Sequence, residues 1–226
     1  MTPLQRLQDD FPWPPGGPTV PSYDHGWLRP GTQVLLDRYV PGAKVILELG
    51  VWLGRSTEYM ARIAPGATIV SVDTWNPEVL VRWAKQKAPH LVEVSRIAEQ
   101  TFHANVAKWG LLGRVIPWRS SSIEAIHKLA VRGVCPTVIY LDTAHTYAQT
   151  VRELAALESR LPTAQIVGDD WDWSGEKRPL SIQRAVREFC ERRSYKVKST
   201  DTGWAILRPG ARSGPGRSSI VPALLP

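Results

Sequence analysis

The chain has 226 residues, which is enough for one α/β domain with a substantial core but too few for two ordinary domains with linkers. Its formal net charge of +7 raises the question of a nucleic-acid partner. The basic residues are scattered, however, and the densest runs also contain acids, so such a partner is not favoured. No apolar run approaches the roughly 20 residues that a membrane span requires.

The amino terminus and the two cysteines indicate the compartment. Asp9 and Asp10 stand where a signal peptide would have its apolar segment. Cys135 and Cys190 have neither metal-ligand spacing nor a disulfide pattern, which is typical of structural thiols in a reducing compartment. We therefore expect a soluble cytoplasmic protein with no membrane contact.

Periodicity divides the chain into an arm, a domain and a tail. Residues 1–28, rich in Pro, Gly and aromatics, predict an irregular arm that could cover an active site, and residues 209–226 predict a flexible tail. Between them, residues 29–208 alternate helical and strand patterns. Helices are predicted over 32–39, 56–63, 78–87, 97–109, 123–131, 147–160 and 180–193. Strands are predicted over 44–49, 68–72, 114–118, 137–141, 164–167, 195–199 and 203–207.

This alternation predicts an α/β fold with a single doubly wound, mostly parallel seven-stranded sheet. The last two strands, joined through residues 201–203, read as a hairpin that adds an antiparallel edge. In such sheets ligands bind beyond the carboxyl ends of the strands, so the residues that follow each strand are the first candidates for a site. The pattern leaves a homo-oligomer open.

The turn after the first strand, ELGVWLGRST, is the first candidate site. Its glycines allow the backbone to approach a ligand closely, and the next helix presents free amides. A dinucleotide fingerprint would place a glycine where Trp52 stands, and the acid Glu48 suits a cationic ligand better, which disfavours a nicotinamide oxidoreductase. Asp73 ends the second strand, where a carboxylate can accept both hydroxyls of a ribose. Together these features favour a nucleoside with an amino-acid tail over a turn that merely links strand to helix.

Three acids follow the next strands of the core. Asp142 comes after the fourth, and Asp169 and Asp170 come after the fifth, so we expect all three at one edge. Their mutual repulsion would be strong without a cation between them, and oxygen-only ligation favours Mg²⁺. The alternative is that the acids cap helices or pair with nearby arginines, namely Arg178, Arg184 and Arg187.

On these residues the chain resembles the class I S-adenosylmethionine-dependent methyltransferases, which have a Rossmann-like fold. The resemblance covers about residues 30–208 and is to the branch of catechol O-methyltransferases and metal-dependent sugar O-methyltransferases of macrolide and aminocoumarin pathways. It implies that Glu48, Gly50 and Ser56 bind the methionine part, Asp73 the ribose and Ser122 the adenine. Ser120 and Ser121 depart from the Gly-Asp that the family often has there. The expected cofactor-binding set is Glu48, Gly50, Trp52, Gly54, Ser56, Thr57, Asp73, Thr74, Ser121, Ser122 and Asp142.

The resemblance also implies that Asp142, Asp169 and Asp170 are Mg²⁺ ligands. Catechol-type relatives carry a Lys three residues after the first metal Asp, and sugar-type relatives often carry an Asp two residues after it; here those positions are His145 and Ala144. We therefore take His145 as the candidate general base, beside Asp142 as the other catalytic residue. Residues 171–175, with two tryptophans, predict a mobile wall of the acceptor pocket.

The function predicted from the sequence is Mg²⁺-assisted methylation of a hydroxyl on a small natural product, a sugar or a phenol. Two alternatives stay open. The positive charge is compatible with an RNA or protein methyltransferase. Ala144, in place of the familiar Asp, is compatible with a cofactor-binding module that has lost catalysis.

Overall fold

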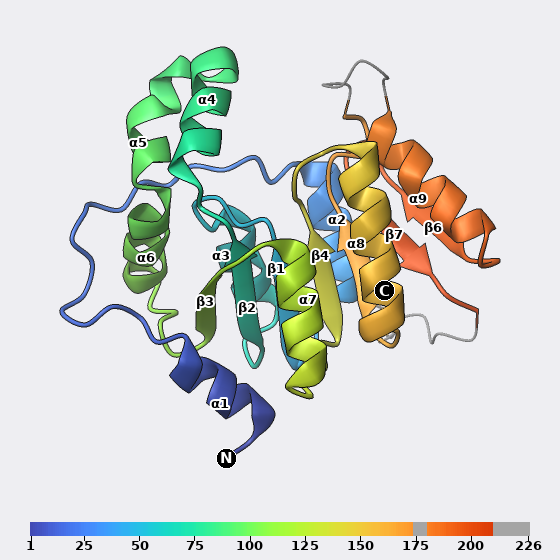
Figure 1. Cartoon of the computed structure of the whole chain (residues 1–226), viewed down its shortest axis with the longest axis horizontal. Helices are drawn as coiled ribbons and strands as arrows, with labels where there is room; N and C mark the ends of the chain where they lie inside the picture. Colours follow the sequence, from blue (N-terminus) through green and yellow to red (C-terminus); the bar gives the residue numbers. More distant parts are fainter. Residues whose placement is uncertain (174–179, 210–226) are drawn as a thin grey trace, which may run out of the picture.

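The computed structural model describes residues 1–173 and 180–209, and its core is one seven-stranded sheet (Figure 1). The strand order is β3-β2-β1-β4-β5-β7-β6, with β1 to β5 parallel and β7 antiparallel to both of its neighbours. The strands are β1 (Val45–Leu49), β2 (Thr68–Asp73), β3 (Val115–Arg119), β4 (Val138–Leu141), β5 (Gln165–Gly168), β6 (Lys196–Ser199) and β7 (Trp204–Leu207). The predicted fold class is confirmed. The second strand of the hairpin inserts beside β5, so that β6 forms the edge.

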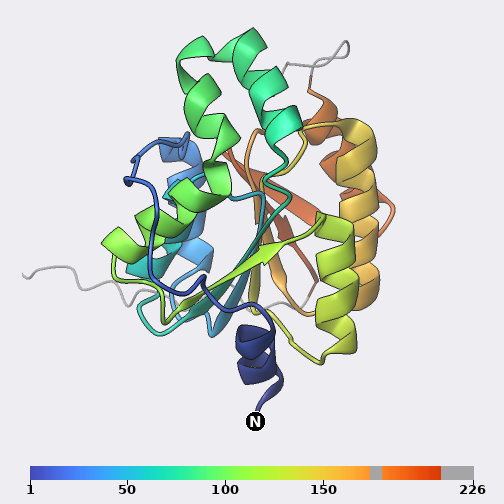
Figure 2. The same cartoon turned by 60° about the vertical axis from the view of Figure 1, so that its left-hand side comes forward.

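Helices cover both faces of the sheet (Figures 1 and 2). One face packs against α2 (Pro30–Tyr39), α3 (Arg55–Ile63) and α6 (Ala98–Lys108); the other packs against α7 (Ser122–Val131), α8 (Tyr147–Arg160) and α9 (Ser181–Glu191). Side chains alternate along a strand, so Ile46 lies in the first core and Leu47 in the second. By the same alternation, Glu48 faces the layer that contains α3.

A helical pair rises beyond the carboxyl end of β2 (Figure 1). It consists of α4 (Pro77–Lys87) and α5 (Val92–Arg96), joined by the short 3₁₀ helix η1 (Pro89–Leu91). Asn76 caps α4 by accepting hydrogen bonds from the first backbone amides, and Ala84, Ala88 and Leu91 form a small core of their own. The sequence predicts only the first of these helices.

The amino-terminal arm is not irregular throughout, which corrects the prediction for residues 1–28. Residues Pro3–Asp10 form the helix α1, with Thr2 as its cap and a proline in the first turn. Its single buried residue, Leu7, joins the core beneath α7, and the Phe11 ring stacks on Trp118 with centroids 4.6 Å apart. Figures 1 and 2 show α1 below the sheet, at the opposite edge from α4.

None of the helices within residues 1–173 and 180–209 combines the length and apolarity needed to cross a lipid bilayer. The predicted tail, residues 209–226, lies outside the described residues except for its first position.

Candidate active site

The turn after β1 passes directly against the end of β4. Gly50 has φ +86°, and a Cβ built on it would overlap with the backbone carbonyl of Asp142. Gly54 has φ +89° at the start of α3, where a Cβ would lie 2.8 Å from the ring of Phe102. Both positions therefore require glycine, for conformation and for space. The turn that the sequence predicts as a cofactor site and the loop that carries Asp142 lie side by side.

Glu48 is fully buried, and its carboxylate is enclosed by hydroxyl groups. Oε1 accepts a hydrogen bond from Ser56 Oγ at 2.5 Å, and Oε2 accepts from Thr57 Oγ1 at 2.6 Å and from Ser71 Oγ at 2.9 Å. Three predicted cofactor residues, Glu48, Ser56 and Thr57, are thus brought together, but they bind one another and fix the start of α3. Burial raises the pKa of Glu48 to about 7, against the opposing effect of the three hydrogen bonds.

This carboxylate predicts a pH dependence of stability. Its pKa in the folded protein, about 7, lies above the ordinary 4.5, so its contribution to stability is complete below pH 4.5 and is lost as the pH rises through 7. In the wild-type protein, the free energy of unfolding should fall by up to about 3 kcal/mol between pH 5 and 8 because of this group. In Glu48→Gln this fall should be absent. Urea unfolding at several pH values measures this. Glu58→Gln, on α3 next to the buried carboxylate's partners Ser56 and Thr57, is the control and should keep the wild-type slope; an unchanged slope in Glu48→Gln would contradict the assignment.

Asp73 lies beside the glycine turn, as the sequence predicts. Its Oδ2 accepts hydrogen bonds from the backbone amides of Val51 and Trp52, at 2.8 and 3.0 Å, and its Oδ1 accepts from the amide of Trp75 at 2.9 Å. These contacts stabilise the turn at Trp52, whose φ is +54°. Thr74 is exposed next to it. The acid after β2 and the turn after β1 form one structural unit at the carboxyl edge.

The two serines predicted at the adenine side lie at the start of α7. Ser121 caps the helix by accepting from the amide of Glu124 at 3.3 Å. Ser122 donates its hydroxyl hydrogen to Glu153 Oε1 at 2.5 Å. Ser122 is therefore directed into the interface between α7 and α8.

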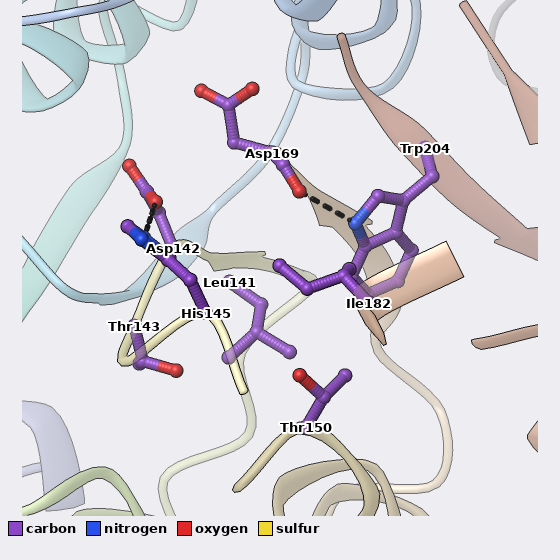
Figure 3. A pocket seen from close by; sticks show the side chains of 8 residues that line it. All are labelled: Leu141, Asp142, Thr143, His145, Thr150, Asp169, Ile182 and Trp204. Atoms are coloured by element: carbon purple, nitrogen blue, oxygen red, sulfur yellow. Dashed lines mark hydrogen bonds and ion pairs between the residues drawn. The ribbon is translucent and has the colours of Figure 1, made fainter. Parts of the chain in front are cut away.

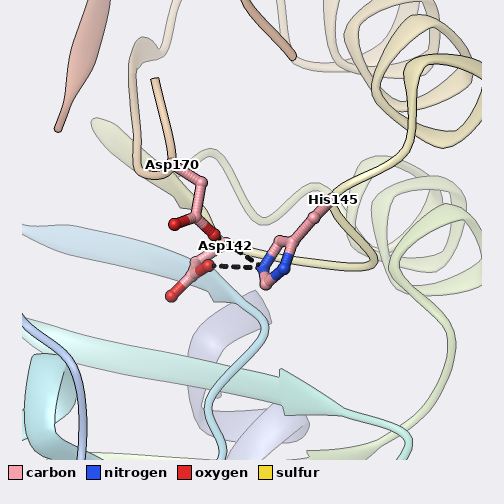
Figure 4. A group of neighbouring side chains, drawn as sticks. All are labelled: Asp142, His145 and Asp170. Atoms are coloured by element: carbon pink, nitrogen blue, oxygen red, sulfur yellow. Dashed lines mark hydrogen bonds and ion pairs between the residues drawn. The ribbon is translucent and has the colours of Figure 1, made fainter. Parts of the chain in front are cut away.

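A compact group of possible ligands lies at the ends of β4 and β5 (Figure 4). Asp142, His145 and Asp170 each place one ligand atom within 4.8 Å of the others. His145 Nε2 lies 3.0 Å from Asp142 Oδ1 and 3.0 Å from Asp170 Oδ2. Burial lowers the pKa of His145, but the hydrogen bonds and charges of the two acids outweigh it and raise the pKa to about 10. In this state the ring is an imidazolium, which must lose a proton before it can act as a base or a ligand.

Asp169 does not join this group. Its carboxylate is nearly buried, accepting hydrogen bonds from Thr32 Oγ1 at 2.5 Å and Tyr140 OH at 3.1 Å, and its backbone carbonyl accepts from Trp204 Nε1 (Figure 3). Burial and the charge of Asp142 raise the pKa of Asp169 to about 7. Of the three predicted metal ligands the structure brings Asp142 and Asp170 together, and the imidazole of His145 lies where a third carboxylate was expected.

Arg29 is the residue of this cluster that sequence reasoning missed. Its Nη2 lies 3.0 Å from Asp170 and 3.7 Å from Asp169, and the guanidinium donates to Asp172 at 2.8 Å. Arg29 and Asp170 are 141 positions apart in the sequence, so no local pattern could predict their contact. The arginines suggested by the sequence lie elsewhere: Arg184 pairs with Glu188, Arg187 lies over the ring of Trp171, and Arg178 is outside the described residues.

Two groups of aromatics lie near the site. Trp171 is 5% exposed and belongs to the core, which corrects its predicted place in an acceptor wall. Trp173 lies edge-on to His145 with ring centroids 4.8 Å apart, while residues 174 and 175 of the predicted wall are outside the described residues. Trp27 of the arm, 52% exposed, contacts Trp52 of the turn and Trp83 of α4, with centroids 6.2 and 5.3 Å apart. The arm therefore covers the turn through an aromatic contact.

Solved structures of methyltransferases share this fold. The O-methyltransferase TomG from Streptomyces achromogenes, involved in tomaymycin synthesis and solved with S-adenosylmethionine, superposes with a TM-score of 0.54 at 18% identity over 80% of this chain and 81% of its own. An O-methyltransferase from Bacillus cereus, solved with S-adenosylhomocysteine, gives 0.52 at 17% identity over 91% and 89%. Precorrin-6y C5,15-methyltransferase from Geobacter metallireducens gives 0.52 at 12% identity over 83% and 92%. These likenesses establish the fold.

The fold is that of a class I methyltransferase. A family profile described as a methyltransferase domain matches residues 47–171, more than half of the chain and the segment from the glycine turn to the acidic cluster. The chain belongs to this methyltransferase family. No curated protein matches it.

Proposed function

We propose that the protein is a cytoplasmic S-adenosylmethionine-dependent O-methyltransferase that acts, with a divalent cation, on a hydroxyl of a small sugar or phenol. One observation carries the proposal: the group formed by Asp142, His145 and Asp170 lies against the glycine turn, since Gly50 packs on the carbonyl of Asp142. A methyl donor at the turn and an acceptor oxygen at the acidic group would be neighbours. Such proximity is the main requirement of a displacement reaction.

The donor set fits a divalent cation. Two carboxylates and an imidazole nitrogen within 4.8 Å are a ligand set common to several such ions, and the nitrogen extends the choice from Mg²⁺ towards Mn²⁺ and Fe²⁺. A bound cation would supply positive charge that stabilises the alkoxide character of the acceptor. Asp169 would not bind the cation itself but would position a ligand, because its Oδ1 accepts a hydrogen bond from the backbone amide of Asp170 at 2.8 Å.

The cofactor would bind along the turn, with Asp73 exchanging its amide contacts for the ribose hydroxyls and Trp52 and Thr74 flanking it. In the transfer, the acceptor oxygen forms a bond to the methyl carbon as the carbon–sulfur bond breaks. S-adenosylhomocysteine leaves, and the hydroxyl proton passes to a base. Because Nε2 cannot hold a cation and accept a proton at once, His145 is the candidate base where Asp142 and Asp170 alone hold the cation. It must first lose the proton that these two acids keep on its ring.

The test is transfer of labelled methyl groups from S-adenosylmethionine to a panel of glycosides and catechols. We expect transfer that EDTA abolishes and that added Mg²⁺ or Mn²⁺ restores. Activity unaffected by EDTA would remove the cation from the proposal. Tight binding of S-adenosylhomocysteine without turnover on any acceptor would favour a cofactor-binding module, and transfer only to RNA or protein would favour the other alternative.

A further inference from the structure

A second carboxylate, Glu153 on α8, is fully buried close to the proposed active site. Its Oε1 accepts hydrogen bonds from Ser122 Oγ at 2.5 Å and from Gln149 Nε2 at 2.8 Å. Its Oε2 accepts from Thr143 Oγ1 at 2.8 Å. Every one of these donors is uncharged. A buried carboxylate whose hydrogen-bond donors are all neutral is costly, and the charge of neighbouring Arg152 offsets only part of the desolvation.

The fold alone does not require this cost. Leu154 and Leu157 on the same helix fill the core between α8 and the sheet, and an apolar residue at position 153 would continue that packing. The three partners show what the carboxylate does instead. Ser122 belongs to the start of α7, Gln149 to the first turns of α8, and Thr143 to the loop between β4 and α8. Glu153 thus joins the chain after β3 to the chain after β4.

The loop that Thr143 anchors carries the proposed chemistry. Asp142 precedes Thr143, and His145 follows two residues later with a left-handed φ of +53°. Such a conformation costs of order 1 kcal/mol or more for a non-glycine residue and persists only where surrounding contacts impose it. At the other end of the loop, Thr146 caps α8 by accepting from the amide of Gln149. The Thr143 hydroxyl is therefore the side-chain contact that fixes the loop between these two ends to α8.

We propose that Glu153 is a positioning residue, which through Thr143 holds the 142–146 loop in the conformation that places His145 between Asp142 and Asp170. The proposal rests on the proposed function for its consequence in catalysis. Its structural part, the fixed loop, is independent of that function. Hydrogen bonds from outside a ligand set commonly change metal affinity by 10- to 100-fold.

The test compares Glu153→Gln with Glu158→Gln. Glutamine retains one acceptor oxygen, but its amide group cannot accept from Thr143 or Ser122, so the network loses at least one bond. Glu158 is the matched control, because it lies on α8 and accepts from Tyr195 OH and Arg208 away from the site. We expect Glu153→Gln to raise the hydrogen-exchange rate of the 143–146 amides at least 10-fold and to weaken Mn²⁺ binding, measured by calorimetry, by 10- to 100-fold. Glu158→Gln should change neither.

Thr143→Val is the second variant, since it removes the loop contact and leaves the carboxylate and its other partners in place. It should reproduce both effects, even if Glu153→Gln does not fold. Wild-type exchange rates in Thr143→Val, or equal changes in the Glu158→Gln control, would overturn the proposal. Absence of Mn²⁺ binding in the wild-type protein would instead count against the cation in the proposed function, and the exchange rates would still decide the role of Glu153.

Discussion

Replacing Gly50 with alanine is expected to abolish binding of S-adenosylhomocysteine and to lower the free energy of unfolding by about 3 kcal/mol or more. Two costs add at this position. The residue has φ +86°, which strains any side chain, and the added Cβ would overlap with the backbone carbonyl of Asp142. Because a backbone carbonyl cannot turn aside as a flexible side chain can, the turn and the end of β4 must move apart. That movement would separate the proposed cofactor site from the proposed cation site.

Gly42→Ala separates these two costs. Gly42 has nearly the same conformation, φ +81°, but a Cβ built on it meets no atom within 4 Å. We expect this control to lose only about 1 kcal/mol and to bind S-adenosylhomocysteine as the wild type does. Urea unfolding and calorimetry measure the two quantities in each variant. Wild-type affinity in Gly50→Ala would show that the turn is not where the cofactor binds.

Asp170→Asn is expected to reduce methyl transfer by roughly 100-fold or more and to weaken divalent-cation binding. The substitution keeps the shape of the side chain, and asparagine tolerates the left-handed φ of +58° that Asp170 adopts. It removes one of the two charges that flank His145 and one of the proposed ligand oxygens. The loss should therefore come from chemistry at the site and leave the affinity for S-adenosylhomocysteine nearly unchanged.

Asp172→Asn is the matched control for this variant. Asp172 also binds Arg29, at 2.8 Å, but it is half-exposed and contributes no atom to the group of ligands. We expect near wild-type rates and cation affinity in this variant, measured with the same labelled donor. Equal losses in the two variants would indicate that the ion pair with Arg29, and not a ligand at Asp170, is what the reaction needs.

The sheet could be predicted because its signals are local. Short apolar runs rich in β-branched residues, bounded by glycines and prolines, predicted the strands. Polar residues directly after the strands predicted the edge of the sheet that carries the site. The glycine turn was predictable for the same reason. A positive φ, such as the +86° of Gly50, is rarely adopted by other residues, so a glycine directly after a strand indicates a turn of this kind. The helix α1 was missed because it buries one residue, Leu7, and a single apolar position makes no periodic pattern.

The side-chain contacts of the site depended on tertiary structure. The adjacent acids after β5 looked equivalent in sequence. The backbone at Asp170 is left-handed and its carboxylate lies against His145, whereas Asp169 binds Thr32 of α2 and Tyr140 of the neighbouring strand β4. Glu48 was expected to face a ligand, yet it lies on the face of β1 that α3 covers. Alternation along the strand predicts that face. The three hydroxyls that enclose the carboxylate come from α3 and β2, so its contacts could not be predicted from the strand alone.

The arm is attached at both ends, and this determines how the edge of the sheet can open. At one end, Trp13 donates to the carbonyls of Leu112 and Val115, and Tyr23 exchanges two hydrogen bonds with Asn105. At the other end, Arg29 binds the acids and leads directly into α2. A segment fixed in this way cannot swing aside as a hinged flap. Residues 24–28, between these attachments, also contact the turn and α3, since Trp52 donates to His25 at 3.4 Å and Arg55 pairs with Asp24 at 3.2 Å, so a ligand that reaches the turn must pass this span.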